Sequence, residues 1–153
     1  AGGGAFGVQA EVSEVVEPVD LNHAAIRRAG DDVTIVTHGA SLYTSLEAAE
    51  QLAAEGLDVE VIDLRTLRPL DTATILGSVG RTGRLVVVED GWRSGGIGAE
   101  IAARVVETAF WDLDAPIERV ASLEVPMPYA QHLEQAALAG VGDVVAAVRR
   151  VLG

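Results

Sequence analysis

The chain of 153 residues carries a formal net charge of −12, and 49% of its residues are hydrophobic. This length and composition predict one globular domain with a sizeable core. The charge argues against nucleic acid and anionic membrane surfaces as partners, and favours either plain solubility or a basic protein partner. Cysteine and lysine are absent, which excludes disulfides, thiolate metal sites, a cysteine nucleophile, a Schiff-base lysine and a P-loop lysine.

Residues 1–17 begin with glycines and follow no hydrophobic period, and we interpret residues 1–20 as a linker, a cloning remnant or the end of an upstream domain. Further along the chain, short apolar runs bounded by turn residues predict strands. These runs are residues 33–38, 59–64, 84–89 and 117–121. Apolar residues at helical spacing predict helices between and after them. These stretches are residues 42–53, 75–79, 98–110, 131–138 and 141–152. Gly56 ends the first of these helices, and Asp71 is the expected N-cap of the second.

Strands that alternate with helices through short connections form βαβ units. We therefore predict an α/β fold over residues 21–153, with a mostly parallel, doubly wound sheet flanked by helices. The run at residues 84–89 is almost uninterrupted in apolar content, as expected for a strand that is covered on both faces.

The stretch VVVEDGWRSGGIGAE, residues 86–100, places a glycine-rich loop between a strand and a helix, as phosphate-binding sites do. The dinucleotide pattern G-x-G-x-x-G fails, because Ile101 stands where the last glycine is needed, and the Walker pattern lacks its lysine. Glu100 also places negative charge in the first helical turn. We expect the glycines at 95, 96 and 98 to serve a tight turn and close helix–strand packing, with an anion at the helix N-terminus as the alternative.

The stretch THGASLY, residues 37–43, also leads from a strand into a helix and is similar to a nucleophile elbow, but Tyr43 replaces the final glycine of G-x-S-x-G. We expect Ser41 to be the N-cap of the helix rather than a nucleophile assisted by His38. The three histidines have no metal-ligand spacing, so no metal site is predicted.

Three carboxylates stand at the carboxyl ends of predicted strands: Asp63, Glu89 and Asp90. Ligands of open α/β sheets bind at such ends, so these residues are candidates for ligand binding, with a plain turn role as the alternative. Trp92 and Arg93 follow at once and are interface candidates, since tryptophan and arginine are common interface anchors. A tryptophan that covers the core fits the sequence equally well.

Three motifs together resemble one family: VIDLRTLRPLD at 61–71, GGIGAEIA at 95–102 and VPMPYAQHLE at 125–134. They are similar to the C-terminal transketolase-type domain of a beta subunit. That subunit belongs to the thiamine-diphosphate-dependent component of 2-oxoacid dehydrogenase complexes. The resemblance runs in order from about Leu21 to Gly153.

The acidic-Gly-Trp turn at 89–92 resembles the pyruvate dehydrogenase branch, whereas the branched-chain 2-oxoacid branch, the alternative, tends to read Glu-Ala-Pro. Residues 20–24, Asp-Leu-Asn-His-Ala, depart from the Pro-Leu-Gly-Lys-Ala that the family often has in its linker. The resemblance implies a parent oxidoreductase that oxidatively decarboxylates a 2-oxoacid, with pyruvate favoured, and transfers the acyl group to lipoamide.

In this family the upstream domain of the beta subunit carries the glutamate that activates the thiamine ring, and the alpha subunit holds the diphosphate and magnesium. The resemblance therefore implies that the parent enzyme uses thiamine diphosphate and magnesium. It also implies that this domain alone has no catalytic, cofactor-binding or metal-binding residue and is inactive.

The resemblance implies a scaffold role with three partners. These are the alpha subunit, a second beta subunit in an α2β2 heterotetramer, and the peripheral subunit-binding domain of the dihydrolipoyl acyltransferase, which is small and basic. The carboxylate before Ala-Pro falls at Asp114, which becomes the docking candidate, assisted by the C-terminal carboxylate of Gly153. A solvated turn carboxylate is the alternative for Asp114.

Two other functions remain open. The chain could be an independent small-molecule-binding α/β domain that uses Asp63, Glu89 and Asp90, or the C-terminal domain of another thiamine enzyme such as transketolase or deoxyxylulose-phosphate synthase. The VPMPYAQHLE motif argues against the second. Since no apolar run has membrane length and no signal segment opens the chain, we expect a cytoplasmic protein, or a mitochondrial matrix protein in a eukaryote.

Overall fold

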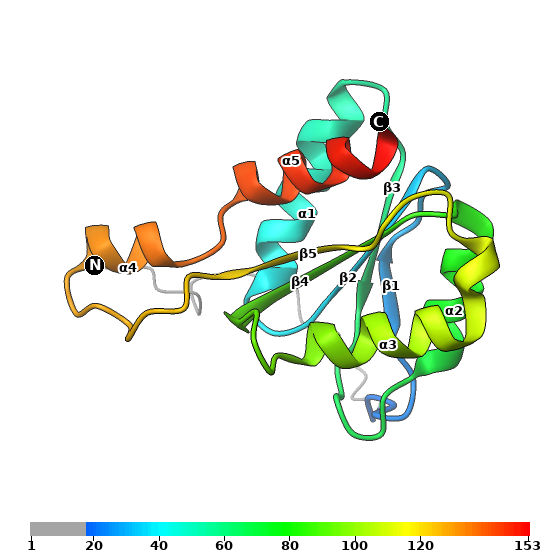
Figure 1. The fold of residues 1–153 in the computed structure, drawn as a ribbon, viewed down its shortest axis with the longest axis horizontal. Coiled ribbons are helices and arrows are strands. Elements are labelled where there is room, and N and C mark those ends of the chain that lie inside the picture. The colour runs from blue at the N-terminus through cyan, green and yellow to red at the C-terminus, as the bar shows by residue number, and fades with distance from the viewer. Residues whose placement is uncertain (1–17) are drawn as a thin grey trace.

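The structure, a computed structural model, describes residues 18–153, so the linker predicted for residues 1–20 lies almost wholly outside the described residues. A five-stranded sheet forms the centre of the molecule (Figure 1), with its strands in the order β1-β3-β2-β4-β5. The strands are β1 Ala25–Arg28, β2 Val33–Thr37, β3 Val59–Asp63, β4 Leu85–Trp92 and β5 Glu118–Ser122. Among the strands of residues 18–153, only β1 pairs antiparallel, which confirms the predicted α/β class with a mostly parallel sheet.

Helices cover both faces of this sheet, α1 and α5 on one side and α2 and α3 on the other (Figure 1). The helices are α1 Ser41–Ala54, α2 Thr72–Thr82, α3 Ile97–Ala109, the 3-10 helix η1 Phe110–Asp112, α4 Gln131–Ala137 and α5 Val141–Leu152. The short helix α4 projects away from this body, as Figure 1 shows. No helix within residues 18–153 combines the length and apolarity that a membrane crossing requires.

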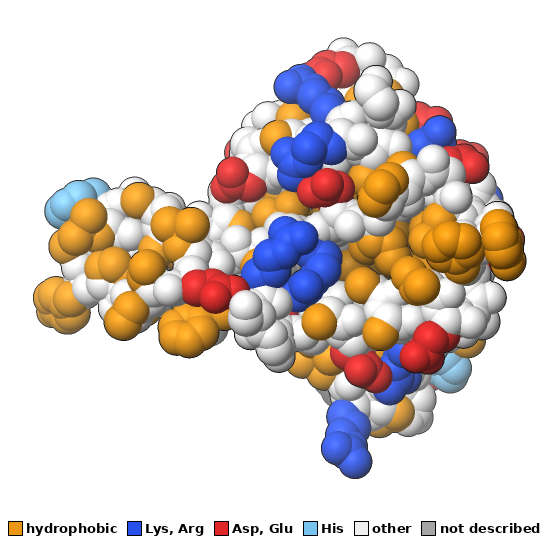
Figure 2. Space-filling model, in the orientation of Figure 1, with side chains coloured by type: hydrophobic (Ala, Val, Ile, Leu, Met, Phe, Trp, Pro, Cys, Tyr) orange, Lys and Arg blue, Asp and Glu red, His pale blue; other side chains and the backbone are white. Residues whose placement is uncertain are grey.

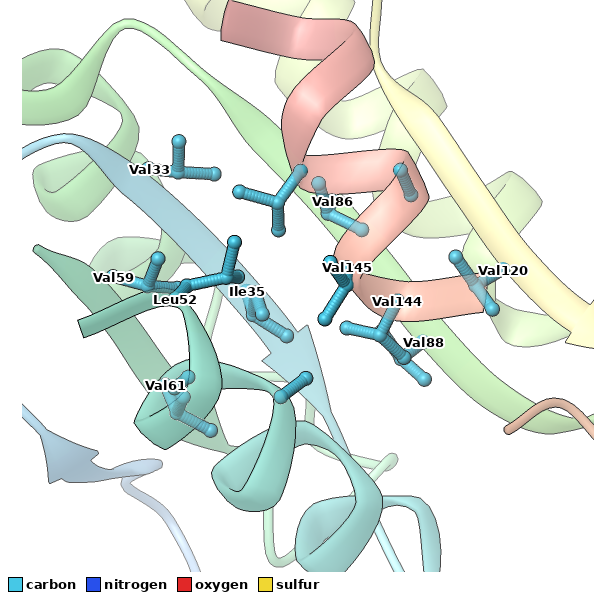
Figure 3. Packing of buried hydrophobic residues seen from close by; sticks show 14 of the residues in the cluster. Val33, Ile35, Leu52, Val59, Val61, Val86, Val88, Val120, Val144 and Val145 are labelled. Atoms are coloured by element: carbon cyan, nitrogen blue, oxygen red, sulfur yellow. The ribbon is translucent and has the colours of Figure 1, made fainter. Parts of the chain in front are cut away.

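Alternate side chains of the central strands supply two separate cores. In β2, Ile35 packs toward α1 and α5, whereas its neighbour Val36 packs toward α2 and α3. In β4, Val86 and Val87 divide in the same way, because successive side chains of a strand point to opposite faces. Figure 3 shows Val86 and Val88 of β4 close to Val144 and Val145 of α5 in the first core. This division explains why β4 is apolar at both faces.

The strand β1 is the one element of the sheet that the sequence pattern did not predict. Its sequence AIRR is half-exposed and contains two arginines, and it lies at the edge of the sheet against β3. Charged side chains are common on edge strands, where they discourage pairing with other chains. An edge strand of four residues therefore carries no apolar run by which it could be recognised.

Of the two N-cap residues predicted from the sequence, one is confirmed and one is wrong. Asp71 caps α2 as predicted, because its Oδ1 accepts a hydrogen bond from Thr74 N at 3.1 Å. Ser41 is not the N-cap of α1: Ala40 is, and Ser41 is the first helical residue. The Ser41 hydroxyl donates instead to the carbonyl of His38 at 2.7 Å.

Candidate functional site

The glycine loop between β4 and α3 is closed by a carboxylate of its own chain. Glu89, only 3% exposed, lies under the loop, and its Oε2 accepts a hydrogen bond from Gly98 N at 3.3 Å. A Cβ at Gly96 or Gly98 would collide with the Glu89 carboxylate. The glycines therefore allow the close packing that the sequence predicted. Glu89 thus occupies Gly98 N, one of the amides at this helix N-terminus that an external anion would need.

An ion pair with Arg119 satisfies the other side of the Glu89 carboxylate. Arg119 Nη2 lies 3.3 Å from Glu89 Oε1, and the Arg119 side chain is 16% exposed. Removing one partner of such a pair leaves an uncompensated buried charge. This pair therefore fastens the carboxyl end of β4 to β5, and the sequence interpretation of Glu89 as a ligand-binding candidate gives way to a structural one.

The first turn of α1 is likewise satisfied internally. Asp90 Oδ2 accepts a hydrogen bond from Ser41 N at 3.2 Å, so Asp90 caps a helix that begins 49 residues earlier. The Ser41 hydroxyl is buried between Thr37, which donates to it at 3.0 Å, and the His38 carbonyl. No imidazole nitrogen within residues 18–153 hydrogen-bonds to this hydroxyl, so the arrangement does not activate Ser41 as a nucleophile.

The three strand-end carboxylates do not converge on one ligand. Asp63 accepts a hydrogen bond from the backbone of Arg65 at 3.1 Å, while Glu89 and Asp90 serve the contacts described above. Over residues 18–153, no three carboxylates or histidines gather in a way that could hold a metal ion. The geometry therefore gives no support to a small-molecule site built from these three residues.

Asp114 stands at the opposite end of the sheet, between η1 and β5. Its backbone N–H donates to Gly83 O at 2.8 Å, and its carboxylate lies against Gly83, whose φ of 65° makes it the left-handed cap of α2. The side chain is 64% exposed, with Arg84 Nη1 3.8 Å away. Arg84 Nε also donates to the carbonyl of Val151 at 3.1 Å. Arg84 therefore links Asp114 to the last turn before Gly153. Asp114 and Gly153 are the two residues that the family resemblance names together as docking candidates.

An apolar cavity of about 640 Å³ adjoins Asp114. Two aromatic side chains that the sequence interpretation missed line it, Phe110 at 53% and Trp111 at 92% exposure. Their rings meet edge to face with centroids 5.0 Å apart. The apolar side chains on the face in Figure 2 include a broad group on the right of the view. Exposed aromatics beside a charged group are typical of protein interfaces. Phe110, Trp111 and Asp114 are called the aromatic surface below.

The interface candidates Trp92 and Arg93 lie at the carboxyl end of β4, away from the aromatic surface. Trp92 is 51% exposed and pairs with Ser122 of β5, so it does not cover the core. Arg93 is exposed, and its Nη1 donates to the Arg119 carbonyl at 2.8 Å. The structure thus separates the four candidate residues into two groups, Trp92 with Arg93 and Asp114 with the C-terminal turn.

Comparison with known proteins identifies the family. The family model "Transketolase, C-terminal domain" matches residues 22–144. The mitochondrial pyruvate dehydrogenase E1 component subunit beta of Drosophila melanogaster is 49% identical over 152 residues, which cover 99% of this chain and 42% of that protein. The subunit of the same name from Rickettsia bellii is 49% identical over 146 residues, 95% of this chain and 45% of that protein. The chain thus spans less than half the length of the curated relatives it matches.

A solved structure leads to the same family. The inactive beta4 tetramer of a split-gene transketolase superposes with a TM-score of 0.77 and 31% identity, over 92% of this chain and 46% of that chain. Sequence motifs, family model and fold agree, and the resemblance predicted from the motifs is confirmed. The chain belongs to the transketolase C-terminal domain family.

Proposed function

We propose that this chain is the C-terminal domain of the beta subunit of a pyruvate dehydrogenase E1 component. The observation that carries this proposal is the 49% identity over almost the whole chain to beta subunits of that name in an insect and a bacterium. The longer protein, called the parent protein below, oxidatively decarboxylates pyruvate on thiamine diphosphate and passes the acetyl group to lipoamide. In a bacterium it is cytoplasmic, and in a eukaryote it lies in the mitochondrial matrix.

We infer that thiamine diphosphate and its magnesium ion bind outside this domain. In the glycine-rich loop between β4 and α3, Gly98 N donates a hydrogen bond to Glu89 rather than being left for a phosphate. Within residues 18–153, no three histidine, aspartate or glutamate side chains gather in a way that could hold a metal ion. We therefore assign no catalytic step to this domain and place the cofactor on the upstream domain and the alpha subunit. That the isolated chain binds no thiamine diphosphate stays a prediction, which calorimetric titration of residues 1–153 with the cofactor would test.

The aromatic surface supports the scaffold role. Asp114 keeps a largely exposed carboxylate with one arginine nearby at 3.8 Å, and the chain as a whole carries a net charge of −12. Such a surface suits a small basic partner. We assign Asp114, with the C-terminal turn at Gly153, to the peripheral subunit-binding domain of the acyltransferase.

A second beta subunit is the occupant that we assign to the apolar part of the aromatic surface. Trp111 is almost fully exposed beside an apolar cavity, and a homodimer interface typically buries such aromatic residues at its centre. The neighbouring solved structure is itself named a beta4 tetramer. The alpha subunit completes the α2β2 heterotetramer.

A substrate assay of the reconstituted parent enzyme tests the proposed reaction. We expect pyruvate to be decarboxylated with a higher kcat/KM than branched-chain 2-oxoacids. A higher kcat/KM for a branched-chain 2-oxoacid would reject the pyruvate assignment and favour the alternative branch.

A charge reversal in the assembled enzyme tests the docking role of Asp114. Asp114→Arg should weaken binding of the acyltransferase domain at least tenfold, because a hydrogen bond to a charged group contributes about 1.5–3 kcal/mol. Decarboxylation of free pyruvate should not change. Glu50→Arg makes the same charge change on the exposed side of α1 and serves as the matched control. Unchanged affinity for Asp114→Arg, or an equal loss for Glu50→Arg, would remove Asp114 from the docking site.

A further inference from the structure

A second cavity, of about 360 Å³, lies along β5 and the helix α5. Three of the eleven arginines of the chain line it, Arg93, Arg119 and Arg150, and we call it the arginine cavity. Cationic side chains gather near the middle of the face shown in Figure 2, with acidic ones beside them. In a chain that is otherwise strongly acidic, this local concentration of guanidinium groups calls for a physical reason.

Arg93 and Arg119 hold each other in place through their backbones. Arg93 Nη1 donates to the Arg119 carbonyl at 2.8 Å, and Arg119 Nη2 donates to the Arg93 carbonyl at 2.6 Å. This exchange brings two like charges to the same cavity. Since like charges repel, the arrangement is stabilised when negative charge lies between or beside them.

The negative charge in the protein balances two of the three arginines. Arg119 pairs with Glu89 at 3.3 Å and Arg150 with Glu118 at 2.8 Å. Arg93 has no ion-pair partner among residues 18–153. A guanidinium carries five N–H donors, and Arg93 directs only Nη1 to an acceptor of the described chain. Its remaining donors and its charge are available to a ligand.

Two carboxylates also line the arginine cavity; each keeps its negative charge and accepts a hydrogen bond from a backbone amide. Glu124 accepts a hydrogen bond from Ser94 N at 2.8 Å, and Asp143 accepts one from Gly140 N at 2.8 Å. The hydrogen bonds from Ser94 keep the pKa of Glu124 below its usual range. These carboxylates fix the two loops that border the cavity, and neither forms an ion pair with Arg93.

One residue that lines the cavity has a buried polar side-chain atom without a partner within the described residues. Ser122, only 4% exposed, lines the cavity, and its Oγ makes no hydrogen bond. Arg119 Nε is also unpartnered, but it lies beside Gly98 under the glycine loop and not at the cavity. An unsatisfied buried polar group costs about 1–3 kcal/mol, so a bound group that reaches Ser122 Oγ would supply the missing partner.

We infer that the arginine cavity binds a small oxyanion ligand that carries phosphate or carboxylate groups. The planar guanidinium fork matches both kinds of oxyanion, and the Ser122 hydroxyl adds a donor from the buried side. A volume of about 360 Å³ equals on the order of ten water molecules. The site therefore has room for a phosphorylated or polycarboxylate metabolite rather than a lone ion. This inference does not depend on the proposed enzymatic function.

Calorimetric titration of the parent protein tests the site with two probes, inorganic phosphate and citrate, at constant ionic strength. We expect saturable binding of at least one probe, with one site per chain. The probe that binds more tightly tells whether the natural ligand carries phosphate or carboxylate groups. Arg93→Gln, a change at an exposed side chain, should weaken this binding at least tenfold.

Two further variants make the test specific. Arg149→Gln, next to Arg150 on α5, removes a cation that pairs with Glu55 outside the cavity, and it should leave the affinity unchanged. Ser122→Ala removes an unpartnered hydroxyl, so it should not destabilise the free protein and should weaken anion binding severalfold. Absence of saturable binding for both probes, or an equal loss of affinity in Arg149→Gln and Arg93→Gln, would overturn the inference.

Discussion

At the carboxyl end of β4, buried charged groups satisfy one another, whereas at its amino end an exposed tryptophan and an exposed carboxylate have few partners in the described chain. Glu89 meets both Arg119 and a backbone amide of α3. Trp111 contacts Phe110, and Asp114 has Arg84 at 3.8 Å. The Glu89 carboxylate is used for the fold, whereas Trp111 and the Asp114 carboxylate are available to another molecule.

This difference separates the residues that identify the family from the residues that we expect to bind a partner. The GGIGAEIA motif names the family in the sequence, and in the structure its glycines make room for the buried Glu89 carboxylate. The aromatic surface matches none of the three motifs and is the better candidate for partner binding. A recognisable motif is therefore no proof of a binding role, because close packing also restricts which residues fit.

The largest expected effect tests the internal pairing at the carboxyl end. Glu89→Ala leaves the Arg119 guanidinium, 16% exposed, without its carboxylate, and should lower the free energy of unfolding by about 3 kcal/mol. Chemical denaturation of the parent protein measures this loss. Glu55→Ala breaks the exposed pair with Arg149 and should cost about 0–1 kcal/mol. Equal losses would contradict the contrast between a buried and an exposed ion pair.

A smaller loss should follow from filling the space above Glu89. Gly98→Ala places a Cβ 2.6 Å from Glu89 Oε1, and such overpacking should cost about 1–3 kcal/mol. Gly77→Ala is the matched control, because a Cβ at Gly77 of α2 meets no atom within 4 Å, and it should stabilise the protein by about 0.5–1 kcal/mol. Denaturation midpoints of both variants check the prediction. A neutral Gly98→Ala would mean that the loop is not tightly packed.

Asp71 extends the internal pairing to β1 and gives it a pH dependence. Burial tends to raise the pKa of Asp71, but hydrogen bonds from Thr74 and Ala24 outweigh burial, and the pKa lies below its usual 3.8. Because the folded-state pKa is depressed, the carboxylate stabilises the fold fully above the unfolded-state pKa. This stabilisation is lost as the pH falls through the folded-state value.

Substitution of Asp71 measures that contribution. Asp71→Ala should lower the free energy of unfolding by about 1 kcal/mol at neutral pH, since it removes the N-cap of α2. The difference from the wild type should begin to shrink as the pH falls below about 4, the unfolded-state pKa, and should continue to shrink through the lower folded-state pKa. Urea denaturation at a series of pH values measures it. A difference that stays constant into the acid range would show that the charge of Asp71 makes no contribution.

The sequence predicted most of the fold because the central elements have regular apolar patterns. Strands β2, β3 and β5 lie within one residue of their predicted bounds, while β4 continues to Trp92. The edge strand β1 lacked an apolar run, and Asp90 as the cap of α1 depends on a contact between residues 49 positions apart. Such contacts leave no local pattern in the chain.

The candidate sites were also predictable to different degrees, because contacts between distant residues leave no local pattern in the sequence. Asp114 was predicted from the family resemblance. The adjacent aromatic residues Phe110 and Trp111 lie just beyond the apolar positions of α3, and this pair could have been recognised in the sequence as an interface candidate. The arginine cavity could not be predicted, because Arg93, Arg119 and Arg150 come from three separate elements or loops. Only the fold brings them together.

The smallest effect on stability is expected at the aromatic surface, which makes it the sharpest contrast with Glu89. Trp111 is 92% exposed, so Trp111→Ala should change the free energy of unfolding of the unassembled beta subunit by no more than about 0.5 kcal/mol. The same substitution should weaken pairing of beta subunits at least tenfold, because a central interface tryptophan contributes about 2 kcal/mol or more.

Sedimentation over a concentration series measures the pairing, with Trp92→Ala as a matched control at the other end of β4. A loss of pairing in Trp92→Ala alone would move the interface to the carboxyl end, and a large loss of stability in Trp111→Ala would make Trp111 part of the fold instead.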